Sequence, residues 1–172
     1  LDGLIAIITG GDSGIGQAVA AAFAKEGADV VIPFYSEQED ADETVRLVKA
    51  AGRRCVPVKC DLKKEESAAQ VVDTAVHEFG HIDILVNNIA VQYPQNSIED
   101  ITAQQLTNTF ATNVFSCFYM TRAVLPHLKS GASIINTASV TAYKGNPTLI
   151  DYSATKGAIV AFTRSLALSL AA

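Results

Sequence analysis

Tyr152 and Lys156 stand four residues apart, and a tyrosine and a lysine at this spacing could together carry out proton transfer. A tyrosine alone has a pKa near ~10 and is a poor base at neutral pH. On a helix, residues i and i+4 share a face, so the ammonium of Lys156 is expected close to the Tyr152 ring. A positive charge about 5 Å from a phenolate stabilises it by roughly 3 kcal/mol, which brings the pKa of the phenol within reach of physiological pH. Because this spacing arises by chance in about one such chain in four, the pair needs support from the rest of the sequence.

The elements that must position this pair alternate between short β-branched runs and longer helical patterns. Strands are predicted at residues 4–8, 29–32, 55–59, 82–86 and 133–137, and helices at residues 14–27, 37–51, 64–79, 102–128 and 152–172. Pro33 is expected to end the second strand, and Pro57 to place the third strand at an edge of the sheet. Thr102 and Gln105 resemble a capping box that opens the long fourth helix. Strands that are apolar on both faces and alternate with helices predict an α/β fold, with a doubly wound parallel sheet and helices on both faces.

A glycine-rich loop follows the first predicted strand and reads Thr9-Gly-Gly-Asp-Ser-Gly-Ile-Gly16. Its glycines at positions 10, 14 and 16 would let the backbone turn sharply and approach a bulky anion. The helix that follows would direct free N–H groups and its positive end at a pyrophosphate. These glycines could instead only ease the packing of a helix on a strand. A strand before the loop and a helix after it favour dinucleotide binding.

Several motifs, taken in order, resemble the short-chain dehydrogenase/reductase family over nearly the whole chain. The resemblance rests on the glycine loop at 9–16, on Asp61-Leu62 after the third strand, on Asn87-Asn88 after the fourth, and on Asn113, Ser139, Tyr152 and Lys156 at the family's spacing. The amino-acid sequence of the loop and of residues 149–152 is most similar to that of the glucose/ribitol-dehydrogenase-like branch. The family implies a Rossmann-type fold and an NAD(P)-dependent oxidoreductase that interconverts an alcohol and a carbonyl by hydride transfer. A nucleotide-binding module without turnover is the alternative.

The resemblance implies a role for each of the four catalytic positions. Tyr152 would be the general acid/base, and Lys156 would lower its pKa and bind the nicotinamide ribose. Ser139 would hold the substrate oxygen, and Asn113 would hold a water that links the lysine to solvent. From the residues alone, Ser139 could be a free surface hydroxyl and Asn113 a tolerated polar residue on an exposed helix face.

The resemblance also implies a cofactor site at the carboxyl ends of the strands. Its predicted residues are Gly10, Asp12, Ser13, Gly14, Ile15, Gly16, Tyr35, Asp61, Leu62, Asn88, Ala90, Tyr152 and Lys156. Asp61 could instead be only a turn or N-cap residue. Ile89 and Ala90 replace the family's Ala and Gly, so a shifted ribose contact is expected at Ala90. Residues 33–36 end the second strand without an acidic or a basic residue; the cofactor is therefore NAD or NADP, and the lack of Arg or Lys favours NAD.

Composition excludes several other classes of protein. The chain has 172 residues, a formal net charge of −5 and scattered Lys and Arg, which argue for one domain over residues 1–172 and against a nucleic-acid partner. It has no apolar run of membrane-spanning length and no secretion signal. Three cysteines without Cys-x-x-Cys spacing indicate reduced structural thiols in a cytoplasmic protein, and the three histidines lie outside any metal-ligand motif.

The last predicted helix is apolar around most of its circumference, so it must be covered on more than one side. Members of the family continue beyond this helix with a sixth strand, a substrate-covering loop and a seventh strand. The chain is therefore expected to be truncated, with its C-terminal strands missing. The resemblance further implies a homodimer or homotetramer built through the two long helices. The small-molecule alcohol or carbonyl substrate is not predicted further.

Overall fold

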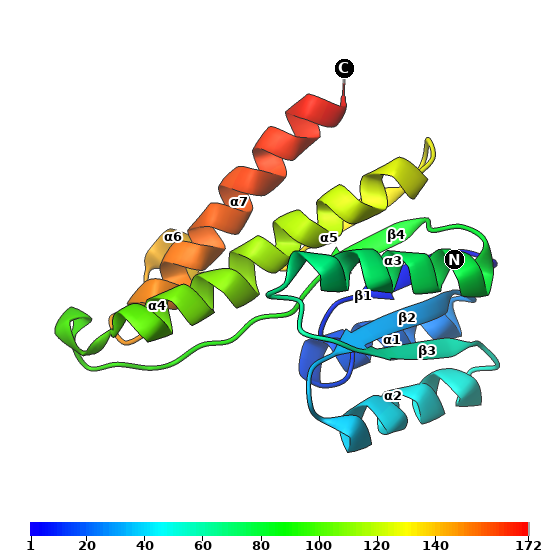
Figure 1. Ribbon diagram of the computed structural model, residues 1–172, viewed down its shortest axis with the longest axis horizontal. Coiled ribbons are helices and arrows are strands. Elements are labelled where there is room, and N and C mark those ends of the chain that lie inside the picture. Colours follow the sequence, from blue (N-terminus) through cyan, green and yellow to red (C-terminus); the bar gives the residue numbers. More distant parts are fainter. Residues whose placement is uncertain (172) are drawn as a thin grey trace.

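A five-stranded parallel sheet lies at the centre of the computed structural model, which describes residues 1–171 (Figure 1). Its strands are β1 (Ile5–Ile8), β2 (Asp29–Phe34), β3 (Cys55–Lys59), β4 (Ile84–Asn87) and β5 (Ser133–Asn136). The spatial order β3-β2-β1-β4-β5 makes the chain reverse direction across the sheet between β1 and β4. In such sheets a crevice for ligands opens at this reversal, beyond the carboxyl ends of the strands.

Helices cover the sheet on both faces, as the sequence predicts. They are α1 (Gly14–Lys25), α2 (Gln38–Ala50), α3 (Glu65–Phe79), α4 (Ala103–Phe110), α5 (Ser116–Val124), α6 (Thr141–Lys144) and α7 (Ile150–Leu170). Alternate residues of β1 enter opposite cores: Ala6 and Ile8 pack with residues of α1 and α2, whereas Ile7 packs with residues of α3 and α5. The doubly wound α/β fold is therefore confirmed (Figure 1). Within residues 1–171, no helix has both the length and the hydrophobicity needed to cross a membrane.

Pro33 does not end the second strand, contrary to the prediction; β2 continues to Phe34. The amide of Asp29 donates towards β1, at Leu4, and the amide of Val30 donates towards β3, at Arg54. By this alternation the nitrogen of Pro33 faces β1, beyond the last β1–β2 pair of Ile7 and Val31. The proline therefore removes no bond of the ladder. Pro57 lies in β3, and β3 is an edge strand as expected.

The predicted helix at 102–128 forms one unbroken helical stretch over residues 103–127, but it is not a uniform α-helix. A π-helical turn at Ala111–Phe115 separates α4 from α5, and a 3₁₀ turn follows at Leu125–His127. Thr102 does cap α4, because its hydroxyl accepts a hydrogen bond from the Gln105 amide (3.0 Å). The reciprocal arm of a capping box is absent from α4, since the Gln105 side chain is bound elsewhere. One half of that prediction is therefore wrong.

The final helix, α7, begins at Ile150 rather than at Tyr152, so both catalytic candidates on it lie within its first two turns. The short helix α6 precedes it in a segment that the sequence prediction left without a helix. In Figure 1, α7 runs beside α4 and α5 and then extends away from the sheet. Its far end is open, since Leu168 retains 80% of its accessible surface.

Candidate active site

The glycine loop forms a tight cradle between β1 and α1. Gly10 has a positive φ of 62° and Gly14 one of 53°, a backbone conformation that favours glycine. A side chain at Gly16 would collide with the carbonyl oxygen of Gly10. The hydroxyl of Thr9 accepts hydrogen bonds from the amides of Asn88 (2.9 Å) and Ile89 (3.1 Å). These two bonds join the loop after β1 to the segment after β4, where the order of the strands reverses.

A cavity of about 470 Å³ opens beside this cradle. Nine of the predicted cofactor residues line it, namely Gly10, Asp12, Ser13, Ile15, Tyr35, Asp61, Leu62, Asn88 and Ala90. Seven lining residues were not predicted, namely Phe34, Lys63, Ile89, Val91, Tyr93, Asn108 and Thr112. Gly14, Gly16 and the four catalytic candidates lie outside the lining. The size of the cavity and its place beyond the strand ends suit a small-molecule cofactor.

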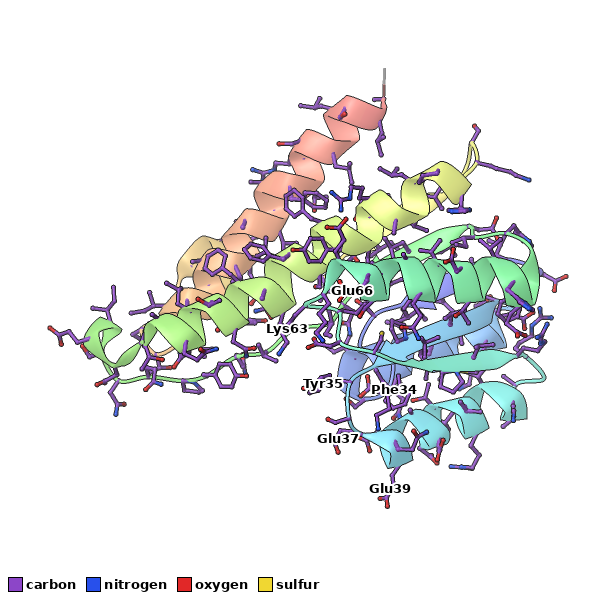
Figure 2. All side chains as sticks on the ribbon, viewed as in Figure 1. Phe34, Tyr35, Glu37, Glu39, Lys63 and Glu66 are labelled. Atoms are coloured by element: carbon purple, nitrogen blue, oxygen red, sulfur yellow. The ribbon has the colours of Figure 1, made fainter. Side chains whose placement is uncertain are left out.

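Lys63 is a cation at this cavity that sequence reasoning missed. Figure 2 shows it facing the end of β2, where Phe34 and Tyr35 lie. Its Nζ is 5.5 Å from the centroid of the Tyr35 ring, and it donates a hydrogen bond of 3.1 Å to the Asn108 side chain. The prediction considered only the residues that follow β2 directly, whereas Lys63 reaches the same place from the segment after β3. Because the carboxyl ends of parallel strands meet at one edge of the sheet, the strand–helix alternation could have suggested that a residue after β3 lies beside the residues after β2.

Carboxylates also lie around the end of β2. Burial raises the pKa of Asp12, and the negative charges of Asp40 and Glu37 raise it further against one backbone hydrogen bond that lowers it. Asp61 lies 3.9 Å from the Lys63 ammonium and accepts a hydrogen bond from the Lys63 amide (3.1 Å). Acidic groups therefore outnumber the one lysine in this part of the site. Asp61 forms a turn hydrogen bond, which was the alternative to a role in cofactor binding, and it also lines the cavity.

Lys156 is buried, with 3% of its surface accessible, and its Nζ lies 5.7 Å from the centroid of the Tyr152 ring. The ammonium donates a hydrogen bond of 2.7 Å to the carbonyl oxygen of Thr137, directly after β5. Burial lowers the pKa of this lysine. The helical spacing thus brings the ammonium to the tyrosine, as predicted, and a backbone oxygen of the sheet holds it there.

Asn113 lies in the π-helical turn and is 2% accessible, so the interpretation as an exposed polar residue is wrong. Its Oδ1 accepts a hydrogen bond from the Val91 amide (2.7 Å), and its Nδ2 donates to the Val91 carbonyl (2.9 Å) and to the Thr155 hydroxyl (3.1 Å). Both amide hydrogens are therefore used within the protein. The side chain fastens the segment after β4 to α7.

Ser139 is half-buried between β5 and α6. Its hydroxyl oxygen accepts hydrogen bonds from the amide (3.2 Å) and the hydroxyl (3.0 Å) of Thr141. It is therefore a fixed group and not the free surface hydroxyl considered as the alternative.

The fold and the site together define a class of protein. A parallel sheet with a glycine cradle at its reversal point is typical of dinucleotide-binding α/β proteins. In addition, a tyrosine and a buried lysine lie one turn apart on a helix that the sheet itself fastens. Among residues 1–171, no three His, Cys, Asp or Glu side chains are grouped so that they could hold a metal ion.

Comparison with known proteins gives the family. Residues 4–172 match the family described as short chain dehydrogenase, and the chain belongs to it. The uncharacterised oxidoreductase YhxC of Bacillus subtilis (strain 168) is 62% identical over 99% of this chain and 60% of its own length. The glucose and ribitol dehydrogenase of Daucus carota is 48% identical over 99% of this chain and 60% of its own length. The chain thus spans about 60% of the length of these curated relatives.

Solved structures agree with the family. A short-chain dehydrogenase from Burkholderia cenocepacia J2315, in complex with NADP, superposes with a TM-score of 0.95 at 33% identity. The match covers 99% of this chain and 70% of that one. The predicted fold and the predicted family are both confirmed.

Proposed function

We propose that this protein is an NAD(P)-dependent oxidoreductase that interconverts an alcohol and a carbonyl by hydride transfer. One observation carries the proposal: Lys156 is buried, is bound to Thr137, and has its ammonium 5.7 Å from the centre of the Tyr152 ring. A nucleotide-binding module without turnover would have no chemical need for a buried cation beside a tyrosine.

The residues present fit a nicotinamide dinucleotide. The tight turn through Gly10, Gly14 and Gly16 brings the start of α1, which would attract a pyrophosphate, beside the cavity. The cavity lined by Tyr35, Asp61 and the other strand-end residues would take the adenosine part. The nicotinamide, when bound, supplies or accepts the hydride.

The chain's own side chains would handle the proton. In reduction, the Tyr152 hydroxyl donates its proton to the carbonyl oxygen of the substrate; in oxidation, the phenolate takes the proton from the alcohol. The ammonium of Lys156 stabilises that phenolate by charge. The Ser139 hydroxyl would orient the substrate oxygen, and Asn113 would keep the segment after β4 in place. The structure adds this fastening role to the water-holding role that the family implies for Asn113.

NAD is the cofactor that the charges favour. Asp12, Glu37 and Asp40 raise the local negative potential, and Lys63 is the opposing charge that lines the cavity. A 2′-phosphate would add further negative charge to this end, whereas the 2′-hydroxyl of NAD would add none. Calorimetric titration of NAD⁺ and NADP⁺ tests this preference, which a tighter complex with NADP⁺ would contradict. Tyr35→Arg, which introduces a bidentate phosphate ligand, is expected to raise the affinity for NADP⁺ about 10-fold.

The partner that we infer is a second copy of the chain in a cytoplasmic homo-oligomer. An apolar groove of about 1010 Å³ runs between α5 and α7. Phe118 lies in this groove, 49% exposed, and packs against Phe162 with the two rings tilted by 46° and their centroids 4.3 Å apart. Exposed aromatic rings over two long helices support a homodimer or homotetramer through these helices.

The test is cofactor-dependent turnover by the full-length protein. D-glucose, ribitol and a panel of small aldehydes and ketones would be followed through the absorbance of the reduced nicotinamide. Removal of the phenolic hydroxyl in Tyr152→Phe is expected to lower kcat by about 10³-fold while cofactor affinity stays the same. Unaltered turnover in that variant would exclude Tyr152 as the acid/base. Cofactor binding without turnover on any substrate would favour the nucleotide-binding module.

A further inference from the structure

Two rows of polar side chains face one another between α4 and α7. Gln105, Thr109 and Asn113 follow one another at intervals of four on α4 and the π-helical turn. Asp151 and Thr155 are also four apart, on α7. Residues four apart share a helix face, so each row is one continuous stripe. Thr109, Asn113, Asp151 and Thr155 are all buried.

Hydrogen bonds join the two rows across the helix contact. Asp151 Oδ2 accepts from the Thr109 hydroxyl (2.8 Å) and from the Gln105 side-chain amide (3.0 Å). One interval further along, the Asn113 amide donates to the Thr155 hydroxyl (3.1 Å). Side-chain hydrogen bonds of this kind fix the rotation and the axial position of α7 against α4, which apolar contacts alone would fix less sharply.

Each residue of the α7 row directly precedes a predicted catalytic residue. Asp151 precedes Tyr152 and Thr155 precedes Lys156, so one face of the helix holds the contact and the neighbouring face carries the proton-transfer pair. Asp151 Oδ1 also accepts a hydrogen bond from the backbone amide of Tyr152 (2.9 Å). The preceding Leu149 provides no side-chain cap for α7. The carboxylate therefore takes up a free amide at the start of the helix, where a negative charge is favourable.

Gln105 extends this connection to the cavity. Its side-chain nitrogen donates both to Asp151 and to the carbonyl oxygen of Tyr93 (3.2 Å), a residue that lines the cavity. Its side-chain oxygen accepts a hydrogen bond from the side-chain amide nitrogen of Gln95 (2.6 Å). A single glutamine thus touches both the first turn of the catalytic helix and the segment after β4.

We propose that Asp151 is a positioning residue that sets where Tyr152 stands relative to the cavity. By holding α7 on Thr109 and Gln105, and through Gln105 on Tyr93, it fixes the distance between the acid/base and the place where the cofactor binds. The inference rests on the proposed function. It concerns a carboxylate that is 3% accessible and pairs with no basic side chain in the described part of the chain.

The test compares Asp151→Ala and Asp151→Asn in the full-length protein, on the substrate of the turnover panel that reacts fastest. Asp151→Ala is expected to lower kcat at least about 10-fold, with the dissociation constants of NAD⁺ and NADP⁺ within about twofold of the parent. Asp151→Asn keeps an oxygen that can accept from Thr109 or Gln105 and is expected to recover part of kcat. Ser153→Ala is the matched control, because among residues 1–171 the Ser153 hydroxyl donates only to the carbonyl oxygen of Leu149, the N-cap residue of the same helix.

Hydrogen–deuterium exchange gives a second measurement that needs no substrate. In Asp151→Ala, amide exchange is expected to speed up both at residues 150–156 and at residues 91–97, since Gln105 joins the two segments. A change at residues 150–156 alone would overturn the connection through Gln105. An unchanged kcat per folded molecule in Asp151→Ala, with Tyr152→Phe inactive, would overturn the positioning role and leave the proposed function intact. Full activity in Tyr152→Phe would instead overturn the proposed acid/base itself.

Discussion

The ammonium of Lys156 donates a hydrogen bond of 2.7 Å to the carbonyl oxygen of Thr137, so α7 is fastened to the end of β5 through its own cation. A backbone carbonyl is a weaker partner for an ammonium than a carboxylate, and burial accordingly lowers the pKa of Lys156. The cation is thus kept beside Tyr152 at a cost in stability.

Lys156→Met is expected to inactivate the protein and yet stabilise its fold. Replacing the buried charge by an apolar chain of similar length removes its desolvation cost and loses one hydrogen bond, for a net gain of about 1 kcal/mol in the free energy of unfolding at neutral pH. Since the pKa of Lys156 is lower in the native than in the unfolded state, the unfolded state binds the proton more strongly. The parent's stability therefore rises as pH rises through the native pKa towards the unfolded value of about 10.4.

Thermal melts of the parent and of Lys156→Met across this alkaline range provide the measurement. The advantage of the variant should be largest at neutral pH and should shrink as the parent lysine loses its proton. An advantage that grows with pH would show that the lysine is not destabilised in the native state.

Gly16→Ala is expected to abolish cofactor binding and to destabilise the fold by about 2 kcal/mol, because the new methyl group would collide with the Gly10 carbonyl. Gly157→Ala is the matched control. Gly157 lies inside α7 with nothing within 4 Å of an added Cβ, so alanine should raise stability by up to about 1 kcal/mol. Calorimetry with NAD⁺ and thermal melts distinguish the two variants, and equal cofactor affinity in both would contradict the cradle.

Phe118→Asp is expected to convert the proposed oligomer into monomers, since a charge would enter the apolar groove between α5 and α7. A stable interface buries about 800 Å² on each partner, and desolvating a carboxylate there without a partner is unfavourable. Light scattering after size-exclusion chromatography would measure the mass. Ser130→Asp, in the turn before β5, adds the same charge away from the groove and should leave the mass unchanged.

The three cysteines are expected to resist alkylation in the native protein. Burial raises the pKa of Cys55 and of Cys117 to about 12, and that of Cys60 to about 11, so almost no thiolate is present at pH 8. Mass spectrometry after treatment with iodoacetamide should detect labelling only once the chain is unfolded. Rapid native labelling of Cys60, the most accessible of the three, would contradict this.

The strand–helix alternation predicted the fold and the glycine loop predicted the cradle, whereas the other predicted cofactor residues came from the family resemblance. Both depend on local patterns: runs of apolar residues define strands, and glycines at fixed spacing define the cradle. Pro33 was misread because its effect depends on which neighbour its nitrogen faces, and that is decided by where β1 stops pairing. Such register is a property of the sheet and not of the strand sequence.

The polar contacts between helices were not predicted. Gln105, Thr109 and Asn113 stand at intervals of four, as do Asp151 and Thr155, but the sequence does not state that these two stripes meet. Lys63 was missed for the same reason, because it approaches Tyr35 from a different strand end. Contacts between segments far apart in the sequence could be predicted only where the family resemblance implied them.

The π-helical turn at Ala111–Phe115 lets one helical rod make two contacts in different directions, which a regular α-helix of the same sequence could not make together. A residue inserted into an α-helix rotates everything after it by about 100°. Before the turn, Thr109 points its hydroxyl at α7; after it, Met120 and Val124 fill the core beneath the sheet. Deleting one residue from this turn would restore regular winding, and then either the polar stripe or the apolar stripe would have to face the wrong neighbour. The chain therefore cannot lose this single extra residue without giving up one of its two contacts.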